Sequence, residues 1–508
     1  MLCALWAAGP YALAAEATAD CRIAGMRNSV RCGVLQRALD PARPDGTKID
    51  VHYVVVPAIA RRKLPDPVFL LAGGPGQSAI ELAPAMMGLL NRLGNRRDIV
   101  FVDQRGTGRS NPLECKPARD EALADQVDPD RQVRQLARCR AELLAQRRIQ
   151  APDDLRFFST PLAMQDLDAV RQRLGAPLIN LVGASYGTRA ALEYQRQFPS
   201  QVRRSVLDGI APPDMVLPAT FAADGQAAFD KMLAACEAEP ACAAQHPRLR
   251  ADWAALQQSL PRPVAVLHPL TGRPERFELT RDMLLAVVRG PLYSPSLAAG
   301  LPAAIGEAAR GNYSALMGLS ALLSSRRAGR VAMGMHFSVI CAEDMPLVER
   351  RAVAAAGTAA AAAPVVSAAS AAFAPAAAAD DGADSFLRLY TRVCADWPRG
   401  EVPAAFYTVP ASASPVLLLS GGLDPATPPR HGERVAKALG PLAQHVVVPN
   451  AGHGVMGLGC MRDVIYRFID AGEDKDAVAA LPADAACARG IPRPSAFQPI
   501  GTADAAGR

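Results

Sequence analysis

The chain has 508 residues and a formal net charge of +6, from 55 lysines and arginines against 49 aspartates and glutamates. This charge is small for the length, and no basic run with interleaved aromatic residues occurs, which excludes nucleic-acid binding as the main function. Half of the residues are hydrophobic, so a large core is available, and one elaborated α/β domain with an inserted subdomain fits the length.

Residues 1–17 are expected to be a signal peptide. An apolar stretch there is followed by two small-residue cleavage options, at residues 12–14 and 15–17. No later segment has eighteen uninterrupted apolar residues, so we expect no membrane span. The interpretation is an exported protein, periplasmic or secreted. The alternative is an apolar terminus without a targeting role.

Cysteine usage supports export. Removal of the signal peptide leaves ten cysteines, an even number, with no C-x-x-C motif and no histidine at metal-binding spacing. We therefore expect no metal site and no cofactor. Sequential pairing into up to five disulfides is the simplest arrangement, for example Cys341 with Cys394, although sequence alone does not fix the connectivity. Buried free thiols in a reducing compartment are the alternative.

Short continuous apolar runs recur along the chain and predict strands that are buried on both faces. In chain order they occupy residues 67–74, 98–106, 178–185, 203–209, 414–424 and 444–454, and residues 49–58 before them, which partly alternate and are rich in β-branched residues, predict a further strand. Helical patterns lie between several of them, for example after the Thr160-Pro161 pair and before Gly440, which suits a helix C-cap. This alternation predicts an α/β fold with a mostly parallel sheet.

One long interval departs from this alternation. Residues 211–407 are rich in alanine and leucine, with proline breaks, and predict a large, mainly helical cap insertion. The catalytic domain is then expected over residues 18–210 and 408–508. Residues 352–381 within the insertion are of low complexity, and we assign them no chemistry.

The motif "GASYG" places Ser185 between two glycines, after a predicted strand and before a predicted helix. Glycines weaken both elements, because they lose the most backbone freedom on folding. A nucleophile elbow accounts for them, since its sharp turn holds a serine hydroxyl above the sheet. An ordinary strand–helix turn with a capping serine is the alternative.

A nucleophilic serine needs a base and an orienting carboxylate. His453 follows the last predicted strand, and Asp424 follows the strand before it. Asp208 also ends a strand and is the second candidate for the acid. The order Ser185, Asp424, His453 is the one expected of α/β-hydrolases.

The tetrahedral intermediate needs two N–H donors. One is the backbone N–H of Tyr186, directly after the nucleophile. The glycine-rich loop of "LLAGGPGQSA" is expected to supply the other, since its glycines permit a tight turn with N–H groups that face one point.

"GGPG" after a strand, "VDQRGTGRS", "GASYG" and "GGLDPATPP…AGHG" together resemble the prolyl aminopeptidase and tripeptidyl aminopeptidase group of α/β-hydrolases, over residues 51–469. Within this group, the exported tripeptidyl aminopeptidases fit the sequence better than the prolyl enzymes do, in the length of the chain, the number of cysteines and the long insertion. The resemblance implies Gly74 as the oxyanion donor of the loop, and a triad of Ser185, Asp424 and His453. Ala72 stands where the prolyl enzymes usually have histidine, which argues against strict proline specificity. We interpret Arg105 and Arg109 of the second motif as structural.

The resemblance implies a serine exopeptidase whose substrates are peptides with a free N-terminus. A carboxylester hydrolase with the same triad is the alternative, and a catalytically silent binding protein is the third class. An exopeptidase must recognise the substrate ammonium, which a buried carboxylate does well. Glu343 and Asp344, in "HFSVICAEDMP" of the insertion, are the candidate amine anchors. A helix cap or a solvated acidic turn is the alternative for these two residues.

Overall fold

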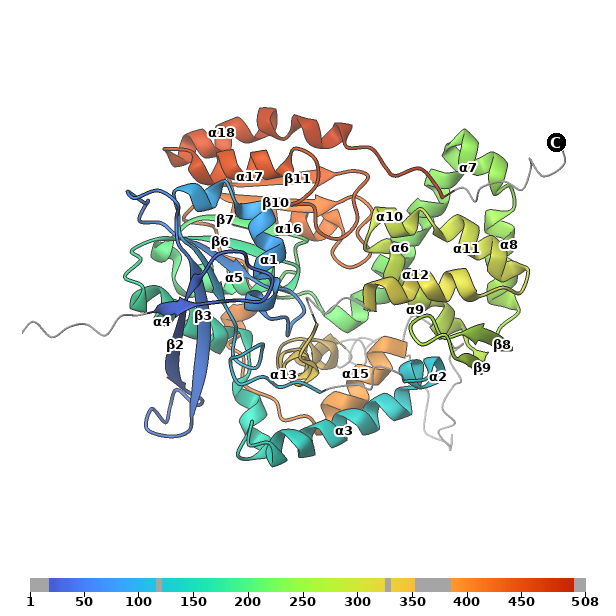
Figure 1. Cartoon of the computed structure of the whole chain (residues 1–508), viewed down its shortest axis with the longest axis horizontal. Helices are drawn as coiled ribbons and strands as arrows, with labels where there is room; N and C mark the ends of the chain where they lie inside the picture. Colours follow the sequence, from blue (N-terminus) through green and yellow to red (C-terminus); the bar gives the residue numbers. More distant parts are fainter. Residues whose placement is uncertain (1–17, 116–120, 325–329, 352–384, 498–508) are drawn as a thin grey trace, which may run out of the picture.

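The computed structural model describes residues 18–115, 121–324, 330–351 and 385–497 (Figure 1). The expected signal peptide and the low-complexity segment lie outside the described residues. Within the described ranges, no helix combines the length and the apolar character that crossing a membrane requires.

A nine-stranded sheet forms the centre of the molecule. In spatial order its strands are β1 (Ala19–Cys21), β2 (Val30–Ala38), β3 (Lys48–Val56), β5 (Ile99–Val102), β4 (Val68–Leu71), β6 (Ile179–Ala184), β7 (Val202–Asp208), β10 (Val416–Gly421) and β11 (Ala443–Val448). The pairings from β1 to β5 are antiparallel, and those from β5 to β11 are parallel. The predicted α/β fold with a mostly parallel sheet is confirmed.

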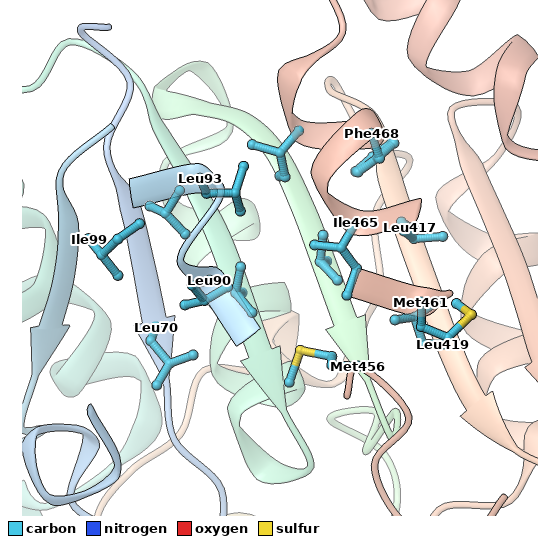
Figure 2. Packing of buried hydrophobic residues seen from close by; sticks show 14 of the residues in the cluster. Leu70, Leu90, Leu93, Ile99, Leu417, Leu419, Met456, Met461, Ile465 and Phe468 are labelled. Atoms are coloured by element: carbon cyan, nitrogen blue, oxygen red, sulfur yellow. The ribbon is translucent and has the colours of Figure 1, made fainter. Parts of the chain in front are cut away.

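Helices cover both faces of the sheet, which explains why its inner strands β4 and β5 are apolar at every position. One face carries α1 (Ala79–Leu90), α17 (Met461–Asp470) and α18 (Asp474–Asp484), and the other carries α4 (Thr160–Arg173), α5 (Tyr186–Gln197) and α16 (Pro429–Leu439). Successive strand residues alternate between the two layers: Leu70 packs with the first set (Figure 2) and Leu71 with the second. Gly440, with φ 85°, ends α16 as a C-cap.

The chain between β7 and β10 leaves the sheet and forms a lobe with its own core (Figure 1). Its elements are α6 (Leu217–Ala238), α7 (Pro240–Gln245), α8 (Leu249–Gln258), β8 (Arg262–Leu267), β9 (Pro274–Leu279), α9 (Arg281–Leu292), α10 (Pro295–Ala298), α11 (Leu301–Ala309) and α12 (Ser314–Ser324). We call these elements the cap lobe. The antiparallel hairpin of β8 and β9 is the non-helical part of this lobe, within an insertion predicted to be mainly helical.

The rest of the insertion packs elsewhere. Helices α13 (Met333–Glu343) and α15 (Ser385–Asp396) share a core with α3 (Pro129–Ala145), which belongs to the segment between β5 and α4 and follows the short α2 (Leu123–Val127). This group, which we call the lower wall, lies beside the sheet and apart from the cap lobe's core (Figure 1). The predicted insertion is thus two packing units, and one of them also uses residues from before β6.

Five disulfides join cysteines that are neighbours in sequence order, as predicted. The pairs are Cys21–Cys32, Cys115–Cys139, Cys236–Cys242, Cys341–Cys394 and Cys460–Cys487. The fourth pair links α13 to α15 and so holds the lower wall together.

Candidate active site

Ser185 stands alone between strand β6 and helix α5, in a strained conformation. Its φ of 57° and ψ of −124° lie where residues other than glycine are seldom found. Gly187 follows, where a Cβ atom would lie 2.1 Å from the carbonyl oxygen of Leu71, so only glycine lets α5 start this close to β4. This is the sharp strand-to-helix turn that a nucleophile elbow requires.

Asp424 and His453 contact each other at the neighbouring strand ends. Asp424 follows β10, His453 follows β11, and the Oδ2 atom of Asp424 lies 2.8 Å from Nδ1 of the imidazole. The carboxylate also accepts hydrogen bonds from the backbone N–H groups of Ala426 and Thr427 and from the Thr427 hydroxyl, at 2.8–2.9 Å. With Nδ1–H donating to Asp424, Nε2 is left as the basic nitrogen.

The turn after β7 lies between Ser185 and His453. The carbonyl oxygen of Asp208 accepts the N–H of Ser185 at 2.8 Å. At the next residue, Gly209, a Cβ atom would lie 3.1 Å from Cε1 of His453. Ser185 and His453 therefore flank the same two residues at the carboxyl edge of the sheet, where ligands of open α/β sheets bind.

The pair has the electrostatics of a base and its orienting acid. Burial alone would raise the pKa of Asp424, but the charge and hydrogen bond of His453 and the N–H groups of Thr427 and Ala426 outweigh it and lower that pKa. Burial would lower the pKa of His453, but the charge and hydrogen bond of Asp424 raise it above the ordinary value. Asp424 thus stays ionised and stabilises an imidazolium.

Asp208, the second candidate for the acid, has other partners. Its carboxylate accepts the backbone N–H groups of Val455 at 2.8 and 3.0 Å and of Met456 at 2.9 Å. Burial raises its pKa to about 6. Asp208 therefore fixes the chain just after His453, while Asp424 contacts the imidazole itself.

The glycine-rich loop after β4 lies against Ser185. At Gly73, a Cβ atom would lie 3.2 Å from the Cβ atom of Ser185 and 3.2 Å from the carbonyl oxygen of Ala184. The next residue is Gly74, and the N–H of Tyr186 belongs to the first turn of α5, where helix N–H groups lack partners within the helix. The two expected oxyanion donors thus belong to segments that meet at Ser185. Their role in binding an oxyanion remains a prediction.

Two family models match the chain at the segments that carry these residues. The model described as "alpha/beta hydrolase fold" matches residues 66–242, with the glycine-rich loop and Ser185. The model described as "TAP-like protein" matches residues 383–487, with Asp424 and His453. The chain is an α/β-hydrolase of the tripeptidyl aminopeptidase-like group.

Curated relatives of this α/β-hydrolase carry names from two reaction classes. The serine protease Hip1 of Mycobacterium tuberculosis is 26% identical over 486 residues, which cover 87% of this chain and 85% of the relative. The tripeptidyl aminopeptidase of Streptomyces lividans is 30% identical over 196 residues, 36% of each chain. Carboxylesterase B of Mycobacterium tuberculosis is 29% identical over 440 residues, which cover 81% of this chain and 78% of the relative.

Glu343 and Asp344, the candidate amine anchors, are both fully buried in this α/β-hydrolase. Glu343 accepts the N–H and the hydroxyl of Thr160, at 2.7 and 3.0 Å. Asp344 accepts two hydrogen bonds from Arg189, at 2.8 and 3.2 Å, and the N–H of Leu217 at 2.9 Å. Every oxygen of the two carboxylates thus has a protein donor. A role in amine recognition remains a prediction.

The lower wall holds the glycine-rich loop through a chain of hydrogen bonds. Nδ1 of His336, on α13, lies 3.3 Å from the carbonyl oxygen of Pro75, and Nε2 lies 2.7 Å from the hydroxyl of Tyr390, on α15. Burial lowers the pKa of His336 to about 4, so the imidazole is neutral at neutral pH and can donate at one nitrogen and accept at the other. The N–H of Ala332 donates to the carbonyl oxygen of Gly76 at 2.9 Å.

Arg105 has the structural surroundings that its interpretation requires. It is buried, makes two hydrogen bonds to Asp166 at 2.8 and 3.0 Å, and donates to the carbonyl oxygens of Leu39 and Phe157. Arg109 is exposed, and its N–H donates to Asp103 at 2.9 Å.

Across the described ranges, no group of three or more histidine, cysteine, aspartate or glutamate residues is arranged to hold a metal ion.

Sequence reasoning missed Thr427, His336 and Tyr293. The Thr427 hydroxyl lies 3.2 Å from Nδ1 of His453. The sequence feature that could have identified Thr427 is a hydroxyl residue in a turn, three positions after Asp424. Tyr293, at the end of α9, accepts the N–H of His453 at its carbonyl oxygen, at 2.9 Å, and its ring centroid lies 5.2 Å from that of the imidazole. His336 and Tyr293 come from the insertion, and no local pattern marks such long-range contacts.

Proposed function

We propose that this chain is a serine peptidase that hydrolyses peptide bonds near the free N-terminus of peptides. The observation that carries the proposal is the contact of Asp424 with His453 at 2.8 Å, beside a serine held in a strand-to-helix elbow. The choice of peptides over other acyl compounds is supported by the relatives named serine protease and tripeptidyl aminopeptidase.

The proposed mechanism follows from these positions. His453 takes the proton of the Ser185 hydroxyl through Nε2 while its oxygen attacks the carbonyl carbon of the scissile bond. The N–H groups of Tyr186 and Gly74 stabilise the oxyanion of the tetrahedral intermediate. The imidazolium then gives its proton to the leaving amine, the acyl-enzyme remains on Ser185, and water attacks it with His453 again as base.

The first test concerns the nucleophile. Ser185→Ala should lower kcat by about 10⁶-fold with the fold intact, because the triad acts as a unit. A fluorophosphonate should label Ser185 alone, as peptide mapping by mass spectrometry would show. An active Ser185→Ala protein, or labelling at another serine, contradicts the assignment.

The second test separates the peptidase from a carboxylester hydrolase, which the relative named Carboxylesterase B favours. Peptide nitroanilides with a free amine, their N-acetylated forms and nitrophenyl esters are compared on one enzyme preparation. The peptidase proposal expects turnover of the free-amine peptides above that of the acetylated ones. Equal cleavage of both forms removes the N-terminal specificity, and turnover of esters alone favours the esterase.

We further propose that the protein is exported, periplasmic or secreted. Five disulfides support this, since such bonds persist in oxidising compartments. N-terminal sequencing of the protein from its native host should find chains that begin near residue 18, and cell fractionation should find them outside the cytoplasm. A full-length chain in the cytoplasm with alkylatable thiols contradicts export.

A further inference from the structure

Arg289, on α9 of the cap lobe, lies among three aromatic side chains from three helices or their ends. Its Cζ atom lies 4.1 Å from the ring centroid of Phe221 on α6, 5.7 Å from that of Phe386 on α15 and 5.8 Å from that of Tyr293. On the α6 side, a Cβ atom at Gly225 would lie 3.2 Å from Cδ of the arginine. Aromatic faces attract a cation, so these contacts hold the guanidinium in one position.

This position is one side chain away from the catalytic base. Nη2 of Arg289 donates to the hydroxyl of Tyr293 at 3.2 Å, and the ring of Tyr293 meets the imidazole of His453 edge-on, with the ring planes at 72°. The arginine charge reaches His453: burial and Arg289 both act to lower the pKa of the imidazole, whereas Asp424 and Asp208 raise it. A charged group of a substrate bound beside His453 would interact with Arg289 in the same way.

Arg289 lacks the counter-ion that other interior arginines have. Arg105 pairs with Asp166, and Arg189 pairs with Asp344, in both cases at 2.8 Å. Among the described residues, no carboxylate oxygen lies within 4.0 Å of the Arg289 guanidinium, and its buried Nε has no hydrogen-bond acceptor. A partly buried cation without a counter-ion is unfavourable, and here it also opposes the imidazolium that the reaction forms.

We propose that Arg289 binds a carboxylate of the substrate and is the specificity-determining residue of this site. A guanidinium suits a carboxylate, because two of its N–H groups can bind both oxygens. The bound carboxylate would also offset the positive charge near His453 and so favour proton transfer from Ser185. The inference rests on the proposed function in taking the substrate as a peptide. The carboxylate is then either the C-terminus of a short leaving peptide or an aspartate or glutamate side chain.

Two substrate pairs test the proposal and separate these sources. Tetraalanine is compared with tetraalanine amide, and Ala-Ala-Glu nitroanilide with Ala-Ala-Gln nitroanilide. The parent enzyme should prefer the charged member of one pair by about tenfold or more in kcat/KM, equivalent to about 1.4 kcal/mol. Arg289→Gln should abolish this preference, so that kcat/KM becomes the same for the charged and the neutral member of that pair. Arg289→Lys, which keeps the charge, should retain part of it.

Arg281→Gln is the matched control, since Arg281 is an exposed arginine at the start of the same helix. It should behave like the parent. Equal turnover within both pairs overturns the inference. So does an Arg289→Gln protein that loses both members of a pair equally and unfolds at lower temperature, because Arg289 is then a packing residue.

Failure of the proposed peptidase function is distinguishable from failure of this inference. If nitrophenyl esters are hydrolysed and no peptide is, the nitrophenyl monoester of glutaric acid is compared with nitrophenyl pentanoate. A preference for the charged ester that Arg289→Gln removes supports the carboxylate site on an esterase. Equal turnover of the two esters overturns the inference there as well.

Discussion

At the scale of single residues, the contact between Asp424 and His453 is supported by a third side chain. The Thr427 hydroxyl donates to Asp424 at 2.8 Å and lies 3.2 Å from Nδ1 of His453. The carboxylate oxygen nearest the imidazole therefore has a second donor that fixes its position. Such an arrangement limits how far the imidazole can turn, which is what a base needs in order to meet the serine.

Asp424→Asn should lower kcat by about 10⁴-fold, because the imidazole loses its orienting acceptor and the stabilisation of its charged form. The pH profile should change as well. The pKa of His453 lies above its ordinary value of 6.5, so the parent loses activity as the pH falls through that raised pKa. Without Asp424 burial dominates, the pKa falls, and the acidic limb of kcat/KM against pH moves to lower pH.

Thr427→Val serves as the graded comparison, with a loss in kcat of about tenfold and a smaller movement of the same limb. An unmoved acidic limb in Asp424→Asn would show that Asp424 does not set the pKa of the base.

Glu343 provides a prediction on pH and stability. Burial raises its pKa to about 7 in the folded chain, against 4.5 for a free side chain. Between these values the folded state holds a proton that the unfolded state has lost, so the contribution of Glu343 to stability falls as the pH rises from 4.5 to 7. Glutamine does not titrate, so the Glu343→Gln variant does not lose stability in this way. The free energy of unfolding of the variant minus that of the parent should therefore increase from pH 5 to pH 8, as measured by urea titrations.

The same variant tests the amine anchor. If Glu343 binds the substrate ammonium, Glu343→Gln raises KM for free-amine peptides by about tenfold and leaves N-acetylated peptides and esters unchanged. An unchanged KM for all of them, with the pH effect on stability present, assigns Glu343 to the folded core alone. Asp344→Asn is the companion variant, expected to destabilise the fold because it breaks the pair with Arg189.

The residues that sequence could predict are those with a local pattern. Ser185 has its two glycines, and Asp424 and His453 each follow a predicted strand. Arg289 and His336 have no such pattern, because their importance comes from contacts with residues far along the chain. Asp208 shows the same limit: it ends a strand just as Asp424 does, and only the packing of the chain after His453 separates their roles.

At the scale of elements, the glycine-rich loop is held by a helix of the insertion. Helix α13 meets the loop through Ala332 and His336, and Tyr390 of α15 supports the imidazole. Glycines alone would leave such a loop free to adopt several conformations, whereas an oxyanion site needs fixed N–H directions. The lower wall thus positions the loop that carries the predicted donor Gly74.

Tyr390→Phe and His336→Phe should lower kcat by about tenfold and change KM little, since the loop loses the bonds that fix its carbonyl at Pro75. His336→Asn, which can still donate to that carbonyl, should recover part of the loss. Tyr466→Phe is the control, because its hydroxyl bonds Asp470 on α17, away from the loop. Parent-like kcat in both Tyr390→Phe and His336→Phe would show that the loop holds its shape without them.

Strand prediction succeeded where continuous apolar runs reflect helices on both faces, as in β4 to β7 and β10. It missed β2, whose later residues alternate in exposure near one edge of the sheet. It also missed the hairpin of β8 and β9, which lies within an alanine-rich, mainly helical part of the sequence. In both cases one face of the strand meets solvent, so no continuous apolar run marks it. The partition of the insertion into two cores depends on tertiary contacts alone.

At the scale of the whole molecule, the five disulfides stabilise different parts of the fold. Cys236–Cys242 closes a short loop within the cap lobe, and Cys341–Cys394 joins two helices of the lower wall across 53 positions of sequence. The second bond closes the longer loop, so it constrains the unfolded chain more.

Replacing Cys341 and Cys394 together by serine should lower the free energy of unfolding by about 2–4 kcal/mol. It should also lower kcat severalfold, since α13 and α15 carry His336 and Tyr390. The matching double replacement of Cys236 and Cys242 should cost less stability and leave kcat unchanged. Peptide mapping without reduction checks the pairing first. Equal kinetic effects of the two replacements would contradict the positioning role of the lower wall.

The hydrogen bond from the backbone N–H of His453 to the carbonyl of Tyr293 restricts how the enzyme can be entered. Gly452 packs on the same carbonyl so closely that a Cβ atom would lie 2.5 Å from it, which leaves the cap lobe and the base-bearing loop in direct backbone contact. A movement of the cap lobe away from the sheet would therefore displace His453. Opening the cap lobe at this contact would break a hydrogen bond of the His453 backbone, so we expect substrate to enter without separation of these two segments.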